Sequence, residues 1–373
     1  MGIYNYISSI LFLVIAFADF GISTATSKYI AQYNRISKDK VNKVLFNSSL
    51  MIFIPSLLII AFLLIFAKNI FPQNYMYLYY TLPFILVYPL TSLLDGIYRG
   101  LKRFKTLSII TVISGIVGIL GSYIFVTTFG LIGALLNQVI FFGTYVILLF
   151  FLNGNIELKI DRKIVKDIGG YSIYFGVATL GYFLFSKANT LILGSYNLME
   201  EIAVYELLNK VYAIYLIPFT VFGQVLAPNV VDMFSSKKYE SVTKIFNKSL
   251  LYSLLSILLF VPISMIITRI GISILFPHYL NDTFYVLLLP VALTCAKAIP
   301  VSVINGGLIT STGHAKYMAI ENVVVGILNV LLNIFVIRIY GYVGIVWVTL
   351  ILQCISTSIL YFVYYKRLQE YIE

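Results

Sequence analysis

The chain has 373 residues, of which 60% are apolar and only 11% are charged, and its mean hydropathy is +0.95. Soluble domains contain about 25% charged residues, so this composition excludes a water-soluble globular protein. Long stretches without charge are typical of helices that cross a membrane, because about 20 residues span the hydrocarbon core. The composition therefore predicts an all-α, polytopic membrane protein.

Apolar stretches of sufficient length recur along the whole chain. Eleven spans are predicted, at residues 3–27, 44–67, 76–98, 106–128, 130–152, 169–193, 201–234, 246–268, 283–308, 317–337 and 342–364. The longest polar connection, residues 153–167, is too short to form a soluble domain.

Basic residues are distributed unevenly over the connections. Of the 26 Lys and Arg residues, twenty follow odd-numbered spans and three follow even-numbered spans, the latter being Lys68, Arg269 and Arg338. Lysine and arginine concentrate on the cytoplasmic side of a membrane. We therefore expect a cytoplasmic C-terminus, and the net charge of +11 needs no nucleic-acid partner.

The chain contains an ungapped internal repeat with an offset of 211 residues. Gly96, Gly115, Gly130 and Gly133 fall on Gly307, Gly326, Gly341 and Gly344 in this alignment. A parallel repeat of this kind is a known plan of membrane transporters. It predicts two lobes, an N-terminal lobe at 1–152 with five helices and a C-terminal lobe at 169–373 with six, joined by a cytoplasmic linker at 153–168. The counterpart of span 169–193 would precede Met1, so we expect a twelve-helix protein that here lacks its first helix.

Three lysines are placed inside predicted spans. Lys210 and Lys297 lie near the middle of the membrane, and Lys187 lies toward the outside. Charges at this depth are costly and generally face a cavity or a partner, so we predict that all three line a substrate cavity suited to a pyrophosphate or an acidic sugar. Two alternatives remain, an i,i+4 pair of Lys210 with Glu206 and snorkelling of Lys187 to the interface.

Two acidic residues are candidates for coupling transport to a proton or a sodium ion. Asp19 lies in the cytoplasmic half of its span, and Glu206 lies toward the outside. The structural alternative for Asp19 is that it stabilises the turn at Gly21.

Charged residues near the cytoplasmic span ends are candidates for an entrance to the cavity. These residues are Arg99, Asp95 and Glu321. The alternative is that Asp95 and Glu321 form ordinary salt bridges with Arg99 and Lys316.

The sequence shows no pattern of catalytic or metal-binding residues. Cys295 and Cys354 fall within apolar spans without ligand partners, and the two histidines, His278 and His314, are predicted on opposite sides of the membrane. We therefore expect no metal, no cofactor and no enzymatic activity.

Several segments follow one another in a specific order. They are Met1–Tyr4 with Phe17–Ala25 and Lys28–Ala31, Leu191–Gly194, Val204–Glu206 with Asn209–Val211, Pro228, and Asn329 and Asn333 followed by Tyr340–Gly344. In this order they resemble the polysaccharide flippases, the O-antigen and capsule branch of the multidrug/oligosaccharidyl-lipid/polysaccharide exporter superfamily. The chain departs from many relatives before Leu191, where Lys187, Ala188 and Asn189 stand in place of an acidic residue.

The resemblance implies transport rather than chemistry. It implies a flippase that moves undecaprenyl-pyrophosphate-linked oligosaccharides across a bacterial plasma membrane by alternating access, for O-antigen, capsule or exopolysaccharide synthesis. The implied partners are this lipid-linked substrate, membrane lipids, other polysaccharide-assembly proteins and a coupling proton or sodium ion. Two other functions stay open, a multidrug exporter of the same superfamily and a membrane glycan polymerase.

Overall fold

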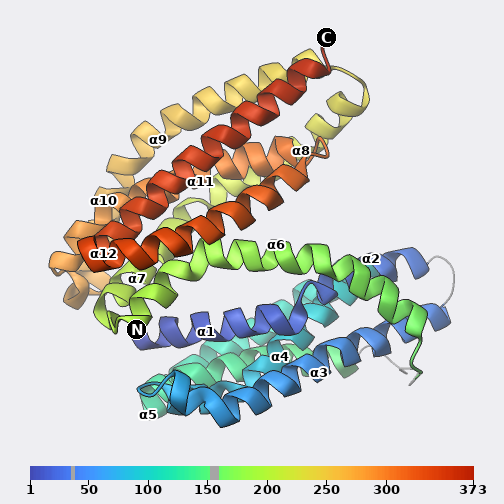
Figure 1. Cartoon of the computed structure of the whole chain (residues 1–373), viewed down its shortest axis with the longest axis vertical. Helices are drawn as coiled ribbons and strands as arrows, with labels where there is room; N and C mark the ends of the chain where they lie inside the picture. The colour runs from blue at the N-terminus through green and yellow to red at the C-terminus, as the bar shows by residue number, and fades with distance from the viewer. Residues whose placement is uncertain (35–37, 152–158) are drawn as a thin grey trace. The chain divides into compact units, whose positions relative to one another are not determined.

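The computed structural model describes residues 1–34, 38–151 and 159–373, and within these ranges the chain is helical without any strand (Figure 1). The predicted linker 153–168 therefore lies partly outside the described residues. The long helices are α1 (Gly2–Asp19), α2 (Ile22–Tyr33), α3 (Lys38–Ile70), α4 (Tyr75–Gly100), α5 (Phe104–Phe151), α6 (Arg162–Ser195), α7 (Met199–Tyr215), α8 (Ile217–Ser235), α9 (Tyr239–Leu275), α10 (Asp282–Ala296) and α12 (Ala315–Glu370). Three short segments complete the order, the 3-10 helix η1 (Pro277–Tyr279), α11 (Ala298–Pro300) and the π-helix η2 (Val301–Ile309).

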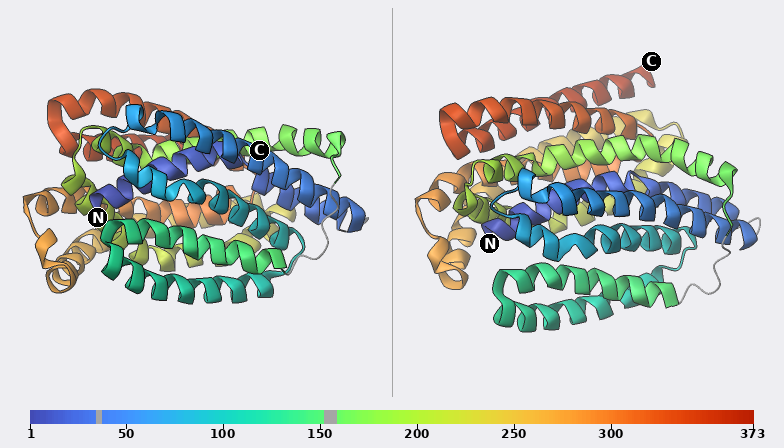
Figure 2. Two further views of the ribbon diagram at one scale, coloured as in Figure 1. Left: turned by 90° about the horizontal axis from the view of Figure 1, so that it is seen from below. Right: turned by 60° about the horizontal axis from the view of Figure 1, so that its bottom comes forward.

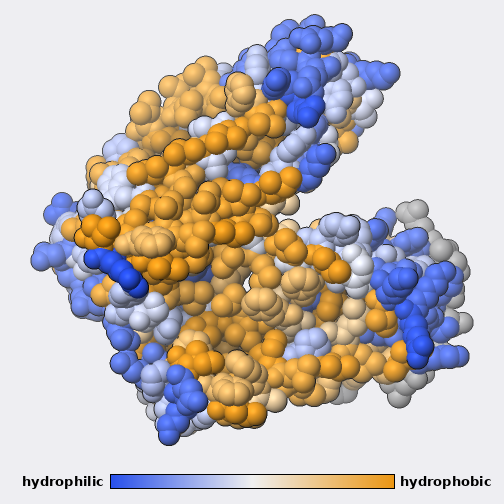
Figure 3. Space-filling view, viewed as in Figure 1, coloured by the Kyte–Doolittle hydropathy of each residue, from blue (hydrophilic) through white to orange (hydrophobic). Residues whose placement is uncertain are grey.

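Nine helical stretches in the described residues are long and apolar enough to cross a membrane. The two longest, α5 and α12, each contain two arms, so the described part of the chain supplies the eleven predicted spans. Large apolar side chains on the outer faces are strongly exposed, for example Ile65 at 68% and Ile274 at 73%. Figure 3 shows these apolar side chains along the middle of the helices and hydrophilic residues at the helix ends. Such surfaces fit lipid and not water, which confirms a multi-pass membrane protein.

Glycine makes both hairpins possible. Gly130 interrupts α5 with φ 55° and ψ −126°, and Gly341 interrupts α12 with φ 59° and ψ −154°. These backbone angles are essentially restricted to glycine. The two arms of α5 lie side by side (Figure 2), and Nδ2 of Asn137 in the second arm donates to the carbonyl of Gly118 in the first at 3.1 Å. The repeat aligns Gly130 with Gly341, and the two residues share one conformation.

The helices group into two compact units, which are described separately. One contains residues 7–183, and the other contains residues 1–6 and 184–373. We call them the 7–183 unit and the 184–373 unit. The division into lobes at residues 1–152 and 169–373 stays a prediction.

In the 7–183 unit, α4 is the central packing element, since it contacts α2, α3 and α5. Tyr98 of α4 is fully buried in the apolar core, and its hydroxyl donates to the carbonyl of Leu149 at 3.1 Å. A side chain at Gly96 would overlap the backbone of Ser23, so this glycine permits α2 and α4 to approach closely. Burial of apolar side chains and one satisfied hydroxyl thus hold this unit together.

The 184–373 unit has two apolar clusters. One joins α7, α10 and α9 around Tyr212 and Phe284, and the other joins α8, α9, η2 and the end of α12 around Phe246 and Tyr364. Helix α8 packs closely on η2, because a side chain at Gly223 would overlap the carbonyl of Ser302.

Three predicted spans are irregular in the structure. The span at 3–27 divides at Phe20 and Gly21, which have φ 35° and 77°. The span at 201–234 changes from α7 to α8 at Leu216, two residues before Pro218. The span at 283–308 changes from α10 to α11 and η2 at Lys297, whose N–H still donates to the carbonyl of Leu293 at 3.0 Å. Proline lacks the N–H that continues a helix, and glycine adopts positive φ at low cost, so both types of irregularity have a local cause.

Candidate functional site

Lys297 lies between α10 and α11 in the 184–373 unit. Pro300 and the π-helical turns of η2 follow it, with the N–H of Thr310 donating to the carbonyl of Asn305, five residues earlier, at 3.1 Å. π-helical segments inside helices are frequent at functional sites. The Lys297 ammonium lies 5.2 Å from the centroid of the Phe185 ring, within the range of a cation–π contact. Within the described ranges, Lys297 forms no ion pair.

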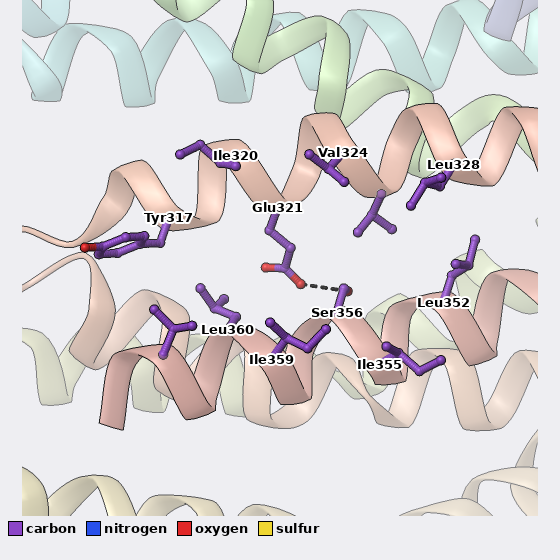
Figure 4. Close-up of a pocket in the computed structure, with 12 residues that line it drawn as sticks. Tyr317, Ile320, Glu321, Val324, Leu328, Leu352, Ile355, Ser356, Ile359 and Leu360 are labelled. Atoms are coloured by element: carbon purple, nitrogen blue, oxygen red, sulfur yellow. Dashed lines mark hydrogen bonds between the residues drawn. The ribbon is translucent and has the colours of Figure 1, made fainter. Parts of the chain in front are cut away.

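Glu321 is the acidic residue whose charge acts on Lys297. It lies on the first arm of α12 and points into a cavity of about 290 Å³ between the two arms (Figure 4). Oγ of Ser356, on the second arm, donates to its carboxylate at 2.8 Å. The other lining side chains are mostly apolar, including Ile320, Val324 and Ile359. The predicted alternative of a Glu321–Lys316 salt bridge is wrong, because the carboxylate is directed between the arms toward Ser356.

Lys187 of α6 forms an ion pair with Glu206 of α7. Its Nζ lies 3.0 Å from Oε1 and 3.1 Å from Oε2 of the carboxylate, and Oγ1 of Thr190 donates to Oε1 at 2.6 Å. Glu206 is 4% exposed, so these partners replace the water that the carboxylate loses. Glu206 therefore pairs across helices with Lys187, and the predicted alternatives of an i,i+4 pair with Lys210 and of a snorkelling Lys187 are both wrong.

Lys210 has a neutral partner instead. Its Nζ donates to Oδ1 of Asn5 at 3.0 Å and lies 5.9 Å from the centroid of the Tyr4 ring. A neutral amide orients the ammonium without cancelling its charge.

A buried amide cluster adjoins the ion pair in the same unit. Oδ1 of Asn189 accepts from Nδ2 of Asn329 at 3.3 Å, Nδ2 of Asn333 at 3.0 Å and Oγ1 of Thr349 at 3.1 Å. Its own Nδ2 donates to the hydroxyl of Tyr205 at 3.1 Å. The cluster connects α6, α7 and both arms of α12 through neutral groups. In the sequence, Asn329 and Asn333 contribute to the family resemblance and were not predicted as site residues. Their i,i+4 spacing in an apolar helix is the signal that indicates such a cluster.

Asp19 ends α1 at the break in the 7–183 unit. Its Oδ1 accepts hydrogen bonds from the backbone N–H of Ser23, at 3.0 Å, and from the Ser23 hydroxyl. The carboxylate thus binds the first turn of α2, where it also complements the helix dipole. This geometry is the structural alternative expected for Asp19, and its role in ion coupling stays a prediction.

Asp95 and Arg99 form an i,i+4 salt bridge on α4, with 2.6 Å between Oδ2 and the guanidinium, as predicted. Oδ1 of Asp95 also accepts from the hydroxyl of Tyr145 on α5 at 3.1 Å. The Arg99 side chain is 63% exposed, so the pair lies at the surface of the 7–183 unit. Its role as a cytoplasmic entrance stays a prediction.

Solved structures share this arrangement of helices at low sequence identity. An inward-facing multidrug resistance MATE family transporter of the MOP superfamily has a TM-score of 0.75 and 12% identity over 99% of this chain and 93% of its own. The lipid II flippase MurJ has a TM-score of 0.67 and 17% identity over 97% of this chain and 80% of its own. A MOP superfamily transporter from Pyrococcus furiosus Vc1, described as having a binding pocket of reverse polarity, has a TM-score of 0.62 and 13% identity over 100% of this chain and 88% of its own.

The helices, the two glycine hairpins and the buried charges define a multi-pass membrane protein with the fold of MOP superfamily transporters. The model of the polysaccharide biosynthesis protein family matches residues 1–234, which is more than half of the chain. The chain belongs to this family, which confirms the predicted resemblance. A search of curated protein sequences found no significant match.

Proposed function

We propose that the protein is a flippase that moves lipid-linked oligosaccharides across a bacterial plasma membrane by alternating access. Membership of the polysaccharide biosynthesis family supports the glycan, and the fold shared with the lipid II flippase MurJ supports a lipid-linked substrate. Structures with this fold are described in both inward-facing and outward-facing conformations, which supports alternating access. The excess of basic residues after odd-numbered spans supports a cytoplasmic C-terminus. The product would be an O-antigen, a capsule or an exopolysaccharide.

Lys297 is the observation that carries this proposal. An ammonium in a membrane-spanning segment is costly unless a partner or a ligand compensates for it. Lys187 is neutralised by Glu206, whereas Lys297 faces an aromatic ring and lies where α10 gives way to α11 and the π-helix η2. A pyrophosphate would supply the missing negative charge. Lys210, held by the neutral Asn5, is the second cation that remains available to a substrate.

The same geometry ranks the candidates for ion coupling. Glu206 already forms an ion pair with the ammonium of Lys187, so protonation of the Glu206 carboxylate would break that pair. Among the described residues, Asp19 accepts hydrogen bonds from Ser23 and forms no ion pair. We therefore favour Asp19 as the residue that binds the coupling ion. Replacing Asp19 with Asn keeps a hydrogen-bond acceptor for Ser23 and removes the charge, so transport should fall while the folded level is kept. Replacement by Ala should lower both.

The decisive experiment compares Lys297→Ala, Lys297→Arg and Lys248→Ala in a cell that lacks its own flippase. Lys248 is exposed near the start of α9 and serves as the matched control. We expect Lys297→Ala to reduce surface glycan at least about ten-fold, the loss of one charge-assisted contact, while Lys297→Arg keeps part of the activity. Immunoblots of the membrane fraction establish equal expression. Surface glycan at the wild-type level with Lys297→Ala would remove this residue from the site.

A multidrug exporter is the second candidate, because the MATE transporter has a higher TM-score than the lipid II flippase MurJ. Cationic drugs require an acidic site, and Lys297, which forms no ion pair among the described residues, opposes this. The same cells distinguish the two functions. Increased resistance to cationic drugs without restored surface glycan would favour the exporter, and longer glycan chains on an unchanged number of carriers would favour a polymerase.

A further inference from the structure

A second polar cavity lies at the end of the 184–373 unit where α12 both begins and ends. It has a volume of about 510 Å³ and is lined by Thr312, His314, Lys316, Tyr317, Arg367 and Tyr371, together with Gly313 and Glu370. We call it the His314 pocket. It is separate from Lys297 and from the Lys187–Glu206 pair, and neither the family nor the proposed transport site assigns it a role. Its volume falls within the range of about 300–1,000 Å³ that is common for small-ligand sites.

Aromatic rings build the rigid wall of the His314 pocket. The His314 ring stacks on Tyr317 with 5.9 Å between centroids and an interplanar angle of 14°, and it meets Tyr364 and Tyr371 edge to face. Nδ1 of His314 lies 3.0 Å from Oγ1 of Thr312, which in turn lies 3.1 Å from the hydroxyl of Tyr364. The wall is therefore fixed before any ligand binds, which lowers the entropic cost of binding.

His314 contributes a ring nitrogen to the pocket. The residue is 7% exposed, and within the described ranges only Nδ1 of its ring has a hydrogen-bond partner. Nε2 of the ring is accessible, so it can donate a hydrogen bond to a ligand oxygen.

The remaining polar groups favour an anion. Lys316 and Arg367 contribute two positive charges, and Glu370 contributes one negative charge that is paired with Arg367. Helix α12 starts at this pocket without a side-chain cap from its N-cap residue, His314, and the N–H of Tyr317 donates to the carbonyl of His314 at 3.1 Å. The positive end of a helix and two cations together favour phosphate oxygens.

Further basic residues surround the pocket. The ring of Tyr371 contacts Phe234 and Tyr239, which flank the turn between α8 and α9 that contains Lys237 and Lys238. Polybasic surfaces at the end of membrane helices attract anionic lipid head groups, and a pocket within such a surface can hold one of them.

We propose that the His314 pocket binds a phosphate-bearing anion at the membrane surface. The phosphate oxygens contact Lys316, Arg367 and the first turn of α12, and His314 donates from Nε2. Only the cytoplasmic placement of the pocket rests on the proposed function. The binding itself depends on the geometry of one unit and can be tested without transport.

Binding is measured on the purified full chain at one fixed salt concentration, with two probes that separate the sources of the phosphate. In the first arm, inorganic pyrophosphate is titrated calorimetrically into the protein in a neutral detergent. In the second arm, native mass spectrometry counts phosphatidic acid retained by protein from nanodiscs of phosphatidylcholine and phosphatidic acid. Binding in the first arm identifies a soluble anion, and retention in the second identifies a lipid head group.

Four variants test whether the anion binds in the His314 pocket. Lys316→Ala and Arg367→Ala, as single variants, should each lower the affinity at least about ten-fold, whereas Lys248→Ala, an equal change of charge outside the pocket, should change it less than about two-fold. Glu370→Gln should raise the affinity about three-fold, because it releases Arg367 and removes the only negative charge from the pocket. Melting temperatures establish that each variant is folded. Absence of saturable binding in both arms, or an equal loss with Lys248→Ala, would overturn the proposal whatever the outcome of the Lys297 experiment.

Discussion

The ammonium of Lys187 lies 3.0 Å from the carboxylate of Glu206, although the two residues lie on different helices and 19 positions apart in the chain. The pair is asymmetric, since the side chain of Lys187 is 35% exposed and that of Glu206 is 5% exposed. Removing either partner therefore leaves the other charge in a different environment. The contact fixes α6 against α7 and removes one of the three intramembrane lysines from the set of free cations.

This asymmetry predicts unequal effects of the two single substitutions. Lys187→Met leaves a buried carboxylate with Thr190 alone and should destabilise the protein by about 2–4 kcal/mol. Glu206→Leu leaves a partly solvated ammonium and should cost less, and the double variant should recover most of the loss. Melting temperatures in detergent measure all three. Additive effects in the double variant would show that the two residues are not energetically coupled.

The amide cluster predicts that the shape and hydrogen-bonding capacity of Asn189 matter more than its neutrality. Asn189→Leu removes the acceptor of Nδ2 of Asn329, whereas Asn333 and Thr349 keep Oδ1 of Asn329 as an acceptor, and it should cost about 1–3 kcal/mol. Asn189→Asp keeps the acceptor for these three donors and should fold to a higher level than Asn189→Leu. The comparison is made by thermal unfolding and by the yield of monodisperse protein. Equal stability of the two variants would contradict the role assigned to the cluster.

The glycine hairpin of α5 predicts opposite effects of two identical substitutions in one helix. Gly130 has positive φ, whereas Gly143 has helical geometry, and an added Cβ would meet open space at both positions. Gly130→Ala should destabilise the protein by about 1–3 kcal/mol, because alanine adopts these backbone angles only with strain, although the space around the Cβ is open. Gly143→Ala should be neutral or stabilise by about 0.5–1 kcal/mol. Unfolding temperatures measure both, and a neutral Gly130→Ala would be inconsistent with the observed turn.

His314 predicts a pH dependence of stability. Burial, together with the charges of Lys316 and Arg367, lowers the pKa of His314 below its ordinary value. Around the ring lie Tyr317, Tyr364 and Tyr371, and Glu370 lines the same pocket.

The sign follows from proton binding. Below about pH 6.5 the unfolded state takes up a proton that folded His314 does not accept, so the unfolding free energy decreases as the pH falls and levels off below the folded pKa. Melting temperatures between pH 8 and pH 5 should show this decrease, and His314→Gln should show less of it. Parallel profiles for the wild type and this variant would exclude His314 as the source.

Much of the architecture was predictable, because it depends on local sequence. Apolar stretches determine where helices can cross the membrane, and the eleven predicted spans were confirmed. The salt bridge of Asp95 with Arg99 was predictable for the same reason, since residues four positions apart face each other on any helix. The glycines at 130 and 341 marked both turns, because other residues avoid their backbone angles.

The partners of the membrane-embedded charges were not predictable in this way. Lys210 donates to Asn5, which lies 205 positions away, and Glu321 accepts from Ser356 on the opposite arm of its hairpin. The local alternatives for Glu206 and Glu321, pairs with Lys210 and Lys316, were wrong, because the partners of both carboxylates lie on another helix or helix arm.

The sequence by itself thus determined the class of protein, the positions of its helices and the few charges that they carry into the membrane. The tertiary structure alone decided which charges form ion pairs, which have neutral partners instead, and where buried amides bond to one another. The physical reason is that hydropathy sets the length of a helix but not its rotation about its own axis. Packing against neighbouring helices fixes that rotation, and with it the partner of every buried polar group.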